Sequence, residues 1–323
     1  MRNEKNNSQP PPFPPPRLMP SKGLVDLQVN GFAGVDFNAD TLTVREVELA
    51  CEALHRESVA YFLPTLVTND PAVLKRNLRT ILQADDRDKA GILGFHLEGP
   101  FISPCDGARG AHPPQWVKPP DLDWIERMQE TAEGSIQILT MSPEWEGSAR
   151  FIESVVSLGI RVAIGHTLAT PDQIADAVKA GASLATHLGN GIPAILPRHP
   201  NPIWSQLAEN GLWASVIGDG FHLSREVFTV IHRLKKERLF LVSDSTQFAG
   251  MTPGRYQTLI GGDVVLTAAG KLHLAENEAL FAGSAMSLKR MIETIAANGW
   301  LSYEEAWHLG STAPWNFLKN NLV

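Results

Sequence analysis

The sequence predicts an α/β protein built as a closed (β/α)8 barrel, and two observations carry this prediction. Eight short, almost continuously apolar runs follow one another along the 323 residues, and helix-like stretches separate most of them. Apolar strands that alternate with helices are typical of a parallel sheet covered on both faces. Eight such units in about 300 residues favour a closed barrel. A doubly wound open sheet is the alternative, but no GxGxxG motif follows an early strand to indicate a dinucleotide site.

The expected strands are the buried apolar runs 24–29, 59–67, 91–97, 135–141, 160–165, 183–188, 212–217 and 239–243. The expected helices have apolar residues at helical spacing or a start signal such as Thr170 before Pro171: 43–57, 147–158, a helix beginning near 171, 223–236, 284–297 and 302–320. Residues 256–275 alternate in polarity and contain Gly-Gly and Ala-Gly, which predicts a small hairpin inserted after the last strand.

The ends and the composition of the chain limit its organisation and its partners. Residues 1–22 are polar and rich in proline, which predicts an extended tail, either loose or docked on a partner, ahead of a single domain over 23–323. The chain has no signal-peptide pattern, no membrane-length apolar run and only two cysteines, so we expect a cytoplasmic protein. The net charge of −7 without a basic stripe argues against nucleic acid or membrane as partners.

Polar residues gather at the ends of the expected strands, where the chemistry of a barrel is located. They are Gln28 and Asn30, Glu98, His166, His187, Asp219 and His222, and Asp244. A single buried histidine is more often a hydrogen-bonded core residue than a ligand. Six strand ends with such groups are different, because burying them without a common partner costs several kcal/mol each. The pattern therefore predicts a shared metal ion.

Glu98, His166 and His187 are the expected ligands of that ion. One carboxylate and two imidazoles leave a coordination position for water, as in catalytic zinc sites. Zn²⁺ suits this set, and Fe²⁺, Mn²⁺ or Co²⁺ also fit. Asp244 is then the natural general base, although Ser243 and Ser245 beside it also allow an N-cap or turn residue.

The motifs around these residues give the chain a family resemblance. They are HLEGPFI (96–102), RGAH (109–112), GHT (165–167), THLGNG (186–191), DGFH (219–222), VSD (242–244) and FAGSAM (281–286). In order and spacing over about residues 23–320, they resemble the N-acetylglucosamine-6-phosphate deacetylase family of the amidohydrolase superfamily. The resemblance implies a (β/α)8 barrel, with Glu98, His166 and His187 on the metal and Asp244 as acid and base.

The resemblance also assigns residues that the pattern alone leaves open. His112 resembles the histidine that polarises the acetyl carbonyl, although beside Pro113 it otherwise reads as a loop residue. Arg198 resembles the phosphate-binding arginine, where the bare sequence indicates a solvated loop. The remaining sugar-phosphate contacts implied by the resemblance are Ala111, Asn190, Gly191, His222, Phe281, Ala282, Gly283 and Ser284.

The sequence departs from the family pattern in three places. Gln28 and Asn30 stand where many amidohydrolases have two histidines, so we expect one metal ion, with Gln28 reaching it through water. Small residues in the segment 189–192 are expected to open room in the sugar pocket. The family's small β-sandwich is expected to be missing, and the default assembly is a homodimer whose second subunit, or the tail, covers the exposed surface.

The resemblance implies hydrolysis of N-acetylglucosamine 6-phosphate to glucosamine 6-phosphate and acetate. Two alternatives stay open. One is a deacylase of another N-acyl amino sugar or amide on the same scaffold. The other is a non-catalytic sugar-phosphate-binding protein, against which the acid/base Asp244 beside a metal set argues.

Overall fold

The computed structural model describes residues 23–84, 91–257 and 262–319. Within these ranges the eight predicted strands form a single parallel sheet in sequence order. They are β1 Leu24–Val29, β4 Val59–Val67, β5 Phe95–Glu98, β6 Ile136–Met141, β7 Arg161–Ile164, β8 Ala182–Ala185, β9 Trp213–Ile217 and β10 Leu239–Val242. The predicted Pro-rich tail (1–22) lies outside the described residues.

The first and last strands of the barrel meet just beyond their carboxyl ends. The amide of Asp244 donates to the Gln28 carbonyl at 2.9 Å, and the amide of Asn30 donates to the Ser245 carbonyl at 2.8 Å. The buried carboxylate of Asp26 adds to this seam, since it accepts the Ser243 amide at 3.1 Å. The sheet is therefore a nearly closed (β/α)8 barrel, as the alternating pattern predicts, and not an open doubly wound sheet.

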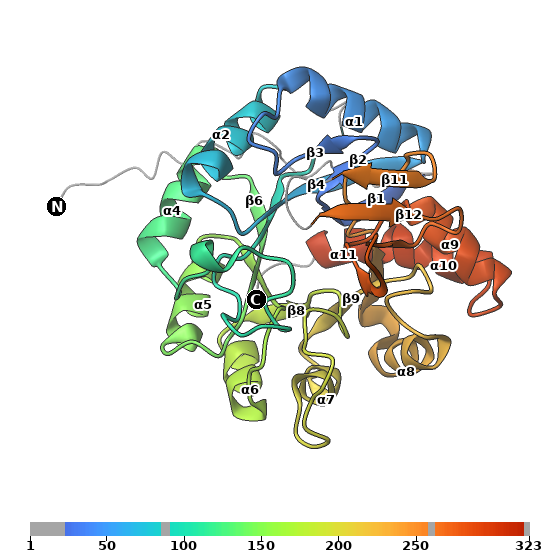
Figure 1. Cartoon of the computed structure of the whole chain (residues 1–323). Coiled ribbons are helices and arrows are strands. Elements are labelled where there is room, and N and C mark those ends of the chain that lie inside the picture. Colours follow the sequence, from blue (N-terminus) through green and yellow to red (C-terminus); the bar gives the residue numbers. More distant parts are fainter. Residues whose placement is uncertain (1–22, 85–90, 258–261, 320–323) are drawn as a thin grey trace.

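Helices surround the strands on the outside of the barrel (Figure 1). They are α1 Val44–Arg56, α2 Pro71–Leu82, α4 Leu122–Thr131, α5 Ser148–Ser157, α6 Pro171–Lys179, α7 Pro202–Ala208, α8 Arg225–Lys235, α9 Leu288–Ala297, α10 Tyr303–Gly310 and α11 Thr312–Lys319, with 3-10 turns η1 Pro114–Trp116 and η2 Lys236–Arg238. Several begin with a capping box; in α6, Thr170 and Gln173 satisfy each other's backbone amides. None of the helices in the described ranges is long and apolar enough to cross a membrane.

The expected helix over 302–320 is in fact two helices, which corrects the prediction. Ser311 has φ −133° and ψ −77°, so the helical path breaks between α10 and α11. Gly310 lies so close to the core that a Cβ there would meet the side chain of Ile292 at 2.8 Å. Pro314 accounts for the break, because it has no amide proton to donate to the Gly310 carbonyl and its ring would clash with that carbonyl in a continuous helix.

The segment inserted after β10 is larger than the hairpin expected at 256–275. It forms a four-stranded antiparallel sheet of β11 Gly254–Gln257, β12 Asp263–Leu266, β13 Leu272–Leu274 and β14 Asn277–Phe281. Its strands lie over the β1 side of the barrel, near the small pair β2 Gly31–Phe32 and β3 Val35–Asp36 (Figure 1). A parallel bridge between Ser245 and Ser284 ties the end of this insertion to the barrel mouth.

Candidate active site

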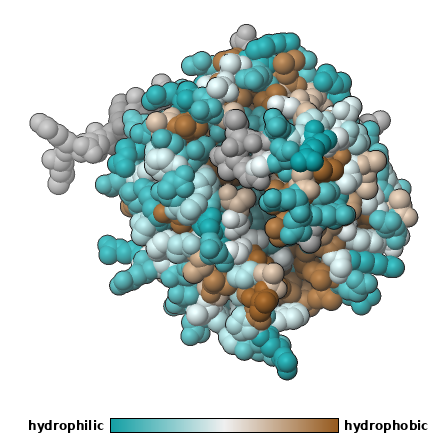
Figure 2. All heavy atoms as spheres, viewed as in Figure 1, coloured by the Kyte–Doolittle hydropathy of each residue, from teal (hydrophilic) through white to brown (hydrophobic). Residues whose placement is uncertain are grey.

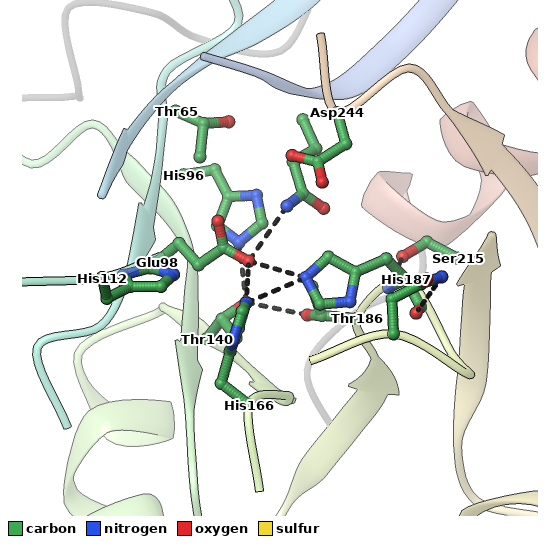
Figure 3. Close-up of polar contacts among 12 residues, drawn as sticks. Thr65, His96, Glu98, His112, Thr140, His166, Thr186, His187, Ser215 and Asp244 are labelled. Carbon is green, nitrogen blue, oxygen red and sulfur yellow. Dashed lines mark hydrogen bonds and ion pairs between the residues drawn. The ribbon is translucent and has the colours of Figure 1, made fainter. Parts of the chain in front are cut away.

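Three ligand-type side chains converge at the carboxyl ends of three barrel strands (Figure 3). Glu98 ends β5, His166 follows β7 and His187 follows β8, and all three are buried. The Nε2 atom of His187 lies 2.9 Å from Glu98 Oε1 and 3.1 Å from His166 Nε2. The structure thus brings together the three residues predicted as metal ligands, whose donor atoms lie within 4.8 Å of one another.

The neighbours of the three residues orient them for a cation. His166 Nδ1 lies 2.9 Å from the Ala108 carbonyl, which can only accept, so Nδ1 carries a proton and Nε2 faces the cluster. Gln28 donates from Nε2 to Glu98 Oε1 at 3.1 Å. A neutral imidazole with an oriented lone pair and a fixed carboxylate are what a divalent ion such as zinc requires. The donor set therefore fits a metal ion.

The pKa shifts of Glu98 and His187 also favour a cation at this site. Burial alone would raise the pKa of Glu98, but the hydrogen bonds and charges of His166 and His187 outweigh it and hold that pKa well below its usual range. Burial alone would lower the pKa of His187, but Glu98 raises it instead. The carboxylate is thus ionised and attracts a positive charge to the site. A divalent ion can replace the proton on the His187 imidazole.

Three residues at the barrel mouth have a left-handed backbone that is unusual for non-glycine residues. His166 has φ 48°, His187 φ 30° and Asp244 φ 47°. Such residues are uncommon and cost about 1–3 kcal/mol each, and they cluster at functional sites. Here each follows the end of a strand, so the turn redirects its side chain from the strand path to the barrel mouth.

Asp244 lies beside the cluster and is not one of its members (Figure 3). Its Oδ1 accepts a 2.7 Å hydrogen bond from Asn30 Nδ2, across the seam between β1 and β10. Burial and the nearby charge of Glu98 raise the pKa of Asp244 to about 6, although His187 and Asn30 act to lower it. A carboxyl group with a pKa just below neutrality can exchange a proton under physiological conditions.

His112 also lies at the site, as the family resemblance implies. Its ring is buried with its centroid 4.5 Å from that of His166, and its Nδ1 lies 3.0 Å from Thr68 Oγ1. Burial, with the charge of His166, lowers its pKa to about 3, so His112 is neutral at pH 7. A neutral imidazole beside the cluster can act as a hydrogen-bond donor.

The known proteins that are similar to this chain include amino-sugar-phosphate deacetylases. No family model matches the chain. It is 32% identical to N-acetylgalactosamine-6-phosphate deacetylase of Escherichia coli over 90% of this chain and 75% of that protein, and 32% identical to N-acetylglucosamine-6-phosphate deacetylase of Bacillus subtilis over 82% and 67%. The solved N-acetyl-D-glucosamine-6-phosphate deacetylase of Mycobacterium smegmatis is 31% identical with a TM-score of 0.77, covering 90% of this chain and 74% of that one.

The chain belongs to the N-acetylglucosamine-6-phosphate deacetylase family. The family enzyme of Pasteurella multocida has a TM-score of 0.81 at 25% identity, covering 92% of this chain and 76% of that one. D-hydantoinase, with a TM-score of 0.52 at 11% identity, shares the fold alone. The chain covers a smaller share of two other curated relatives: 60% of the length of the Danio rerio deacetylase and 59% of the length of the Caenorhabditis elegans deacetylase.

The residues that resemble the sugar-phosphate contacts of the deacetylase family lie at the same end of the barrel. His222 is held by Asp219, whose Oδ2 lies 2.7 Å from its Nδ1. The ring of Phe281 lies 5.1 Å from the ring of His222. The predicted segment 281–284 ends at Ser284, whose carbonyl accepts the Thr246 amide at 2.9 Å, so this segment lies next to Asp244 in the chain fold.

The other predicted contacts lie on loops. Asn190 is half-buried and donates to the His187 carbonyl at 3.3 Å. Ala111 is exposed beside buried His112. Arg198 is exposed in the loop between β8 and α7, so the structure places it on the surface of this end of the barrel rather than against the cluster.

Two glycines of segment 189–192 lie close to neighbouring side chains, and the extra room that we expected in the sugar pocket stays a prediction. A Cβ on Gly191 would lie 3.0 Å from His166 Nδ1, and a Cβ on Gly189 would lie 2.9 Å from Leu223. Both glycines therefore permit close backbone approach to neighbouring side chains. Gly191 therefore lies directly against His166, one of the three residues predicted as metal ligands.

Two residues of the site carry no assignment from the sequence. Thr68 follows β4 and contacts His112, and Glu144 follows β6 and binds the segment after His166. Both follow strand ends, so the rule that identified the ligands could have found them. Thr68 lies in the sequence TND and Glu144 in the sequence SPE, and both sequences are typical of turns. The sequence alone therefore predicts turn residues at these two positions.

Proposed function

We propose that this chain is a metal-dependent deacetylase that hydrolyses N-acetylglucosamine 6-phosphate to glucosamine 6-phosphate and acetate. The observation that carries the proposal is the convergence of Glu98, His166 and His187 with Asp244 beside them, in a chain whose relatives bear the names of such deacetylases. A pure sugar-phosphate binder has no use for a buried acid/base group next to a metal set.

We propose one divalent ion per chain, held by Glu98, His166 and His187, with Zn²⁺ the first choice from the ligand types. Such an ion lowers the pKa of bound water and polarises a carbonyl. Gln28 supports a single ion, because its amide is directed to Glu98 Oε1 and is a weak ligand itself.

The protein residues then divide the proton transfers between them. Asp244 accepts a proton from the attacking water and delivers it to the departing amine, for which its pKa of about 6 is suited. His112 donates a hydrogen bond to the acetyl oxygen as negative charge develops there, and its low pKa keeps it from titrating.

Substrate recognition is proposed for the loops around the mouth. The guanidinium of Arg198 is assigned to the phosphate, whose oxygens it can bind in pairs. His222, fixed by Asp219, is assigned to the sugar phosphate together with Ala111, Asn190, Gly191 and the segment 281–284.

The test is acetate release from protein of known metal content. N-acetylglucosamine 6-phosphate, its unphosphorylated form and N-acetylgalactosamine 6-phosphate are compared; the third is included because one relative carries its name. We expect protein with one metal ion per chain to release acetate from a phosphorylated sugar and not from the unphosphorylated one. Absence of release from folded, metal-loaded protein with all three compounds would overturn the proposed substrate class.

We also propose a cytoplasmic homodimer. Both cysteines are free thiols, which accords with a reducing compartment. Apolar side chains remain exposed on α8, where Val227, Val230 and Leu234 follow helical spacing. Figure 2 shows further apolar residues gathered on the lower part of the face viewed, over the region of α7 and β9.

A further inference from the structure

The carboxylate of Glu144 collects hydrogen bonds from three separate segments at the barrel mouth. Its Oε1 accepts from Ser103 Oγ at 2.8 Å. Its Oε2 accepts from Ser142 Oγ and from the Leu168 amide, both at 2.8 Å. Ser103 and Ser142 are fully buried, and Glu144 itself is half-buried. The donors come from the segments after β5, β6 and β7, so one side chain connects three loops.

These bonds close a ring around the backbone of a metal-ligand residue. The Ser103 amide donates to the His166 carbonyl at 2.9 Å, while the Ser103 hydroxyl donates to Glu144. Two residues after His166, the Leu168 amide donates to the same carboxylate. The ring therefore encloses the segment 166–168, which begins with the left-handed backbone of His166.

We propose that Glu144 is a positioning residue that holds His166 in the geometry needed for metal binding. The inference rests on the proposed metal site and adds a residue to it. The His166 ring is fixed by the Ala108 carbonyl, which lies on the same β5 loop that Glu144 holds through Ser103. Glu144 thus supports both the backbone and the ring orientation of this ligand.

The chemistry of the donors decides which substitutions are informative. The two serine hydroxyls can rotate and become acceptors, but the Leu168 amide is a fixed donor that needs an acceptor. Glu144→Gln keeps one carbonyl oxygen for that amide, with its NH₂ group facing a serine. Glu144→Met has a similar length and no strong acceptor, so it breaks the ring.

The experiment measures Zn²⁺ affinity by competition with a chelator, and the visible spectrum of the Co²⁺-loaded protein. Glu144→Met should weaken Zn²⁺ binding by about 10–100-fold, as loss of a group behind a metal ligand does. It should also alter the Co²⁺ spectrum. Glu144→Gln should recover most of the affinity. The matched control is Glu305→Met, which removes the acceptor of the α10 capping box at a distance from the site. The control should lower thermal stability and leave metal affinity unchanged.

Zn²⁺ affinity of folded Glu144→Met within twofold of the wild type and of Glu305→Met would overturn the proposal. If Glu144→Met does not fold, Ser103→Ala breaks the same ring with a smaller change and should weaken Zn²⁺ binding several-fold; unchanged affinity there would equally overturn it. Failure of the wild-type protein to bind Zn²⁺ would instead reject the metal site itself, so the two failures are distinguishable.

Discussion

Asn30 and Asp244 are joined by a 2.7 Å hydrogen bond that crosses the seam of the barrel from the first strand to the last. Asn30 stands where histidine is expected in many amidohydrolases, and here its amide binds the carboxylate that we propose as the acid/base group. The bond stabilises the ionised form of Asp244, because an amide N–H donates a stronger hydrogen bond to a carboxylate than to a neutral carboxyl group.

Asn30→Leu should therefore move the acid limb of the pH–kcat profile to higher pH. Asn30 lowers the pKa of Asp244, so loss of this donor raises that pKa and the ionised base forms only at higher pH. The expected shift is about one pH unit, since a hydrogen bond to a charged group contributes about 1.5 kcal/mol. Exposed Asn298→Leu serves as the control. An unmoved acid limb at full metal occupancy would show that Asn30 does not tune this group.

Asp244→Asn should abolish most turnover while the metal stays bound. The amide cannot accept the proton of the attacking water, and loss of a general acid/base group lowers kcat by about 10²–10⁴-fold. Metal content should be unchanged, because Asp244 lies outside the set of Glu98, His166 and His187. Acetate release and metal analysis on one preparation provide the test. Wild-type turnover in this variant would remove Asp244 from the mechanism.

Arg198→Ala should raise KM for the phosphorylated substrate by about 10–100-fold, because a charge-assisted hydrogen bond to phosphate is lost. Turnover of the unphosphorylated sugar should be unaffected. Arg150→Ala, on the exposed side of α5, removes the same charge away from the mouth and should change neither value. An equal effect of Arg198→Ala on the KM values of both sugars would show that the guanidinium does not bind the phosphate.

The barrel and its metal set could be predicted because parallel strands place their carboxyl ends at one face. Glu98, His166 and His187 are far apart in sequence, but each ends an apolar strand or lies two residues beyond one. Their convergence follows from topology alone. Periodicity and strand ends therefore locate the three candidate ligands without any knowledge of the loops.

The remaining features depend on loop conformations and close packing, which a local pattern does not encode. The Asn30–Asp244 bond requires closure of the seam, and the contact of Thr68 with His112 requires two loops to meet. The left-handed turn at His166, which Gly191 approaches closely, likewise arises only in the folded mouth.

Asp26→Asn should change how stability depends on pH. Burial raises the pKa of Asp26 to about 7, against about 3.9 in an unfolded chain, so the folded protein binds this proton more tightly. The contribution is fully present below about pH 4 and is lost as pH rises through about 7. The free energy of unfolding of the wild type relative to Asp26→Asn should thus fall between pH 4 and 8, by at most about 4 kcal/mol.

Denaturant unfolding of both proteins at several pH values measures this difference. Asp123→Asn, at an exposed carboxyl on α4, is the control and should give a difference that varies little with pH. A constant difference between the wild type and Asp26→Asn would mean that the pKa of Asp26 is the same in the folded and unfolded chains, so burial does not raise it.

Gly191→Ala separates backbone strain from pressure on a metal ligand. Gly191 has φ 62°, and a Cβ there would lie 3.0 Å from His166 Nδ1, the atom that donates to the Ala108 carbonyl. Gly147 has φ 77° with no atom within 4 Å of its Cβ position. Alanine at either position should therefore lower the free energy of unfolding by about 1 kcal/mol, because both backbones are left-handed.

Only Gly191→Ala should also weaken Zn²⁺ binding, by about tenfold or more, since the added methyl displaces the His166 ring from its hydrogen bond. Chelator competition on the two variants measures this directly. Equal Zn²⁺ affinity in Gly191→Ala and Gly147→Ala would show that the loop yields instead of the imidazole. The close approach of Gly191 would then be a feature of packing and not a constraint on the metal ligand.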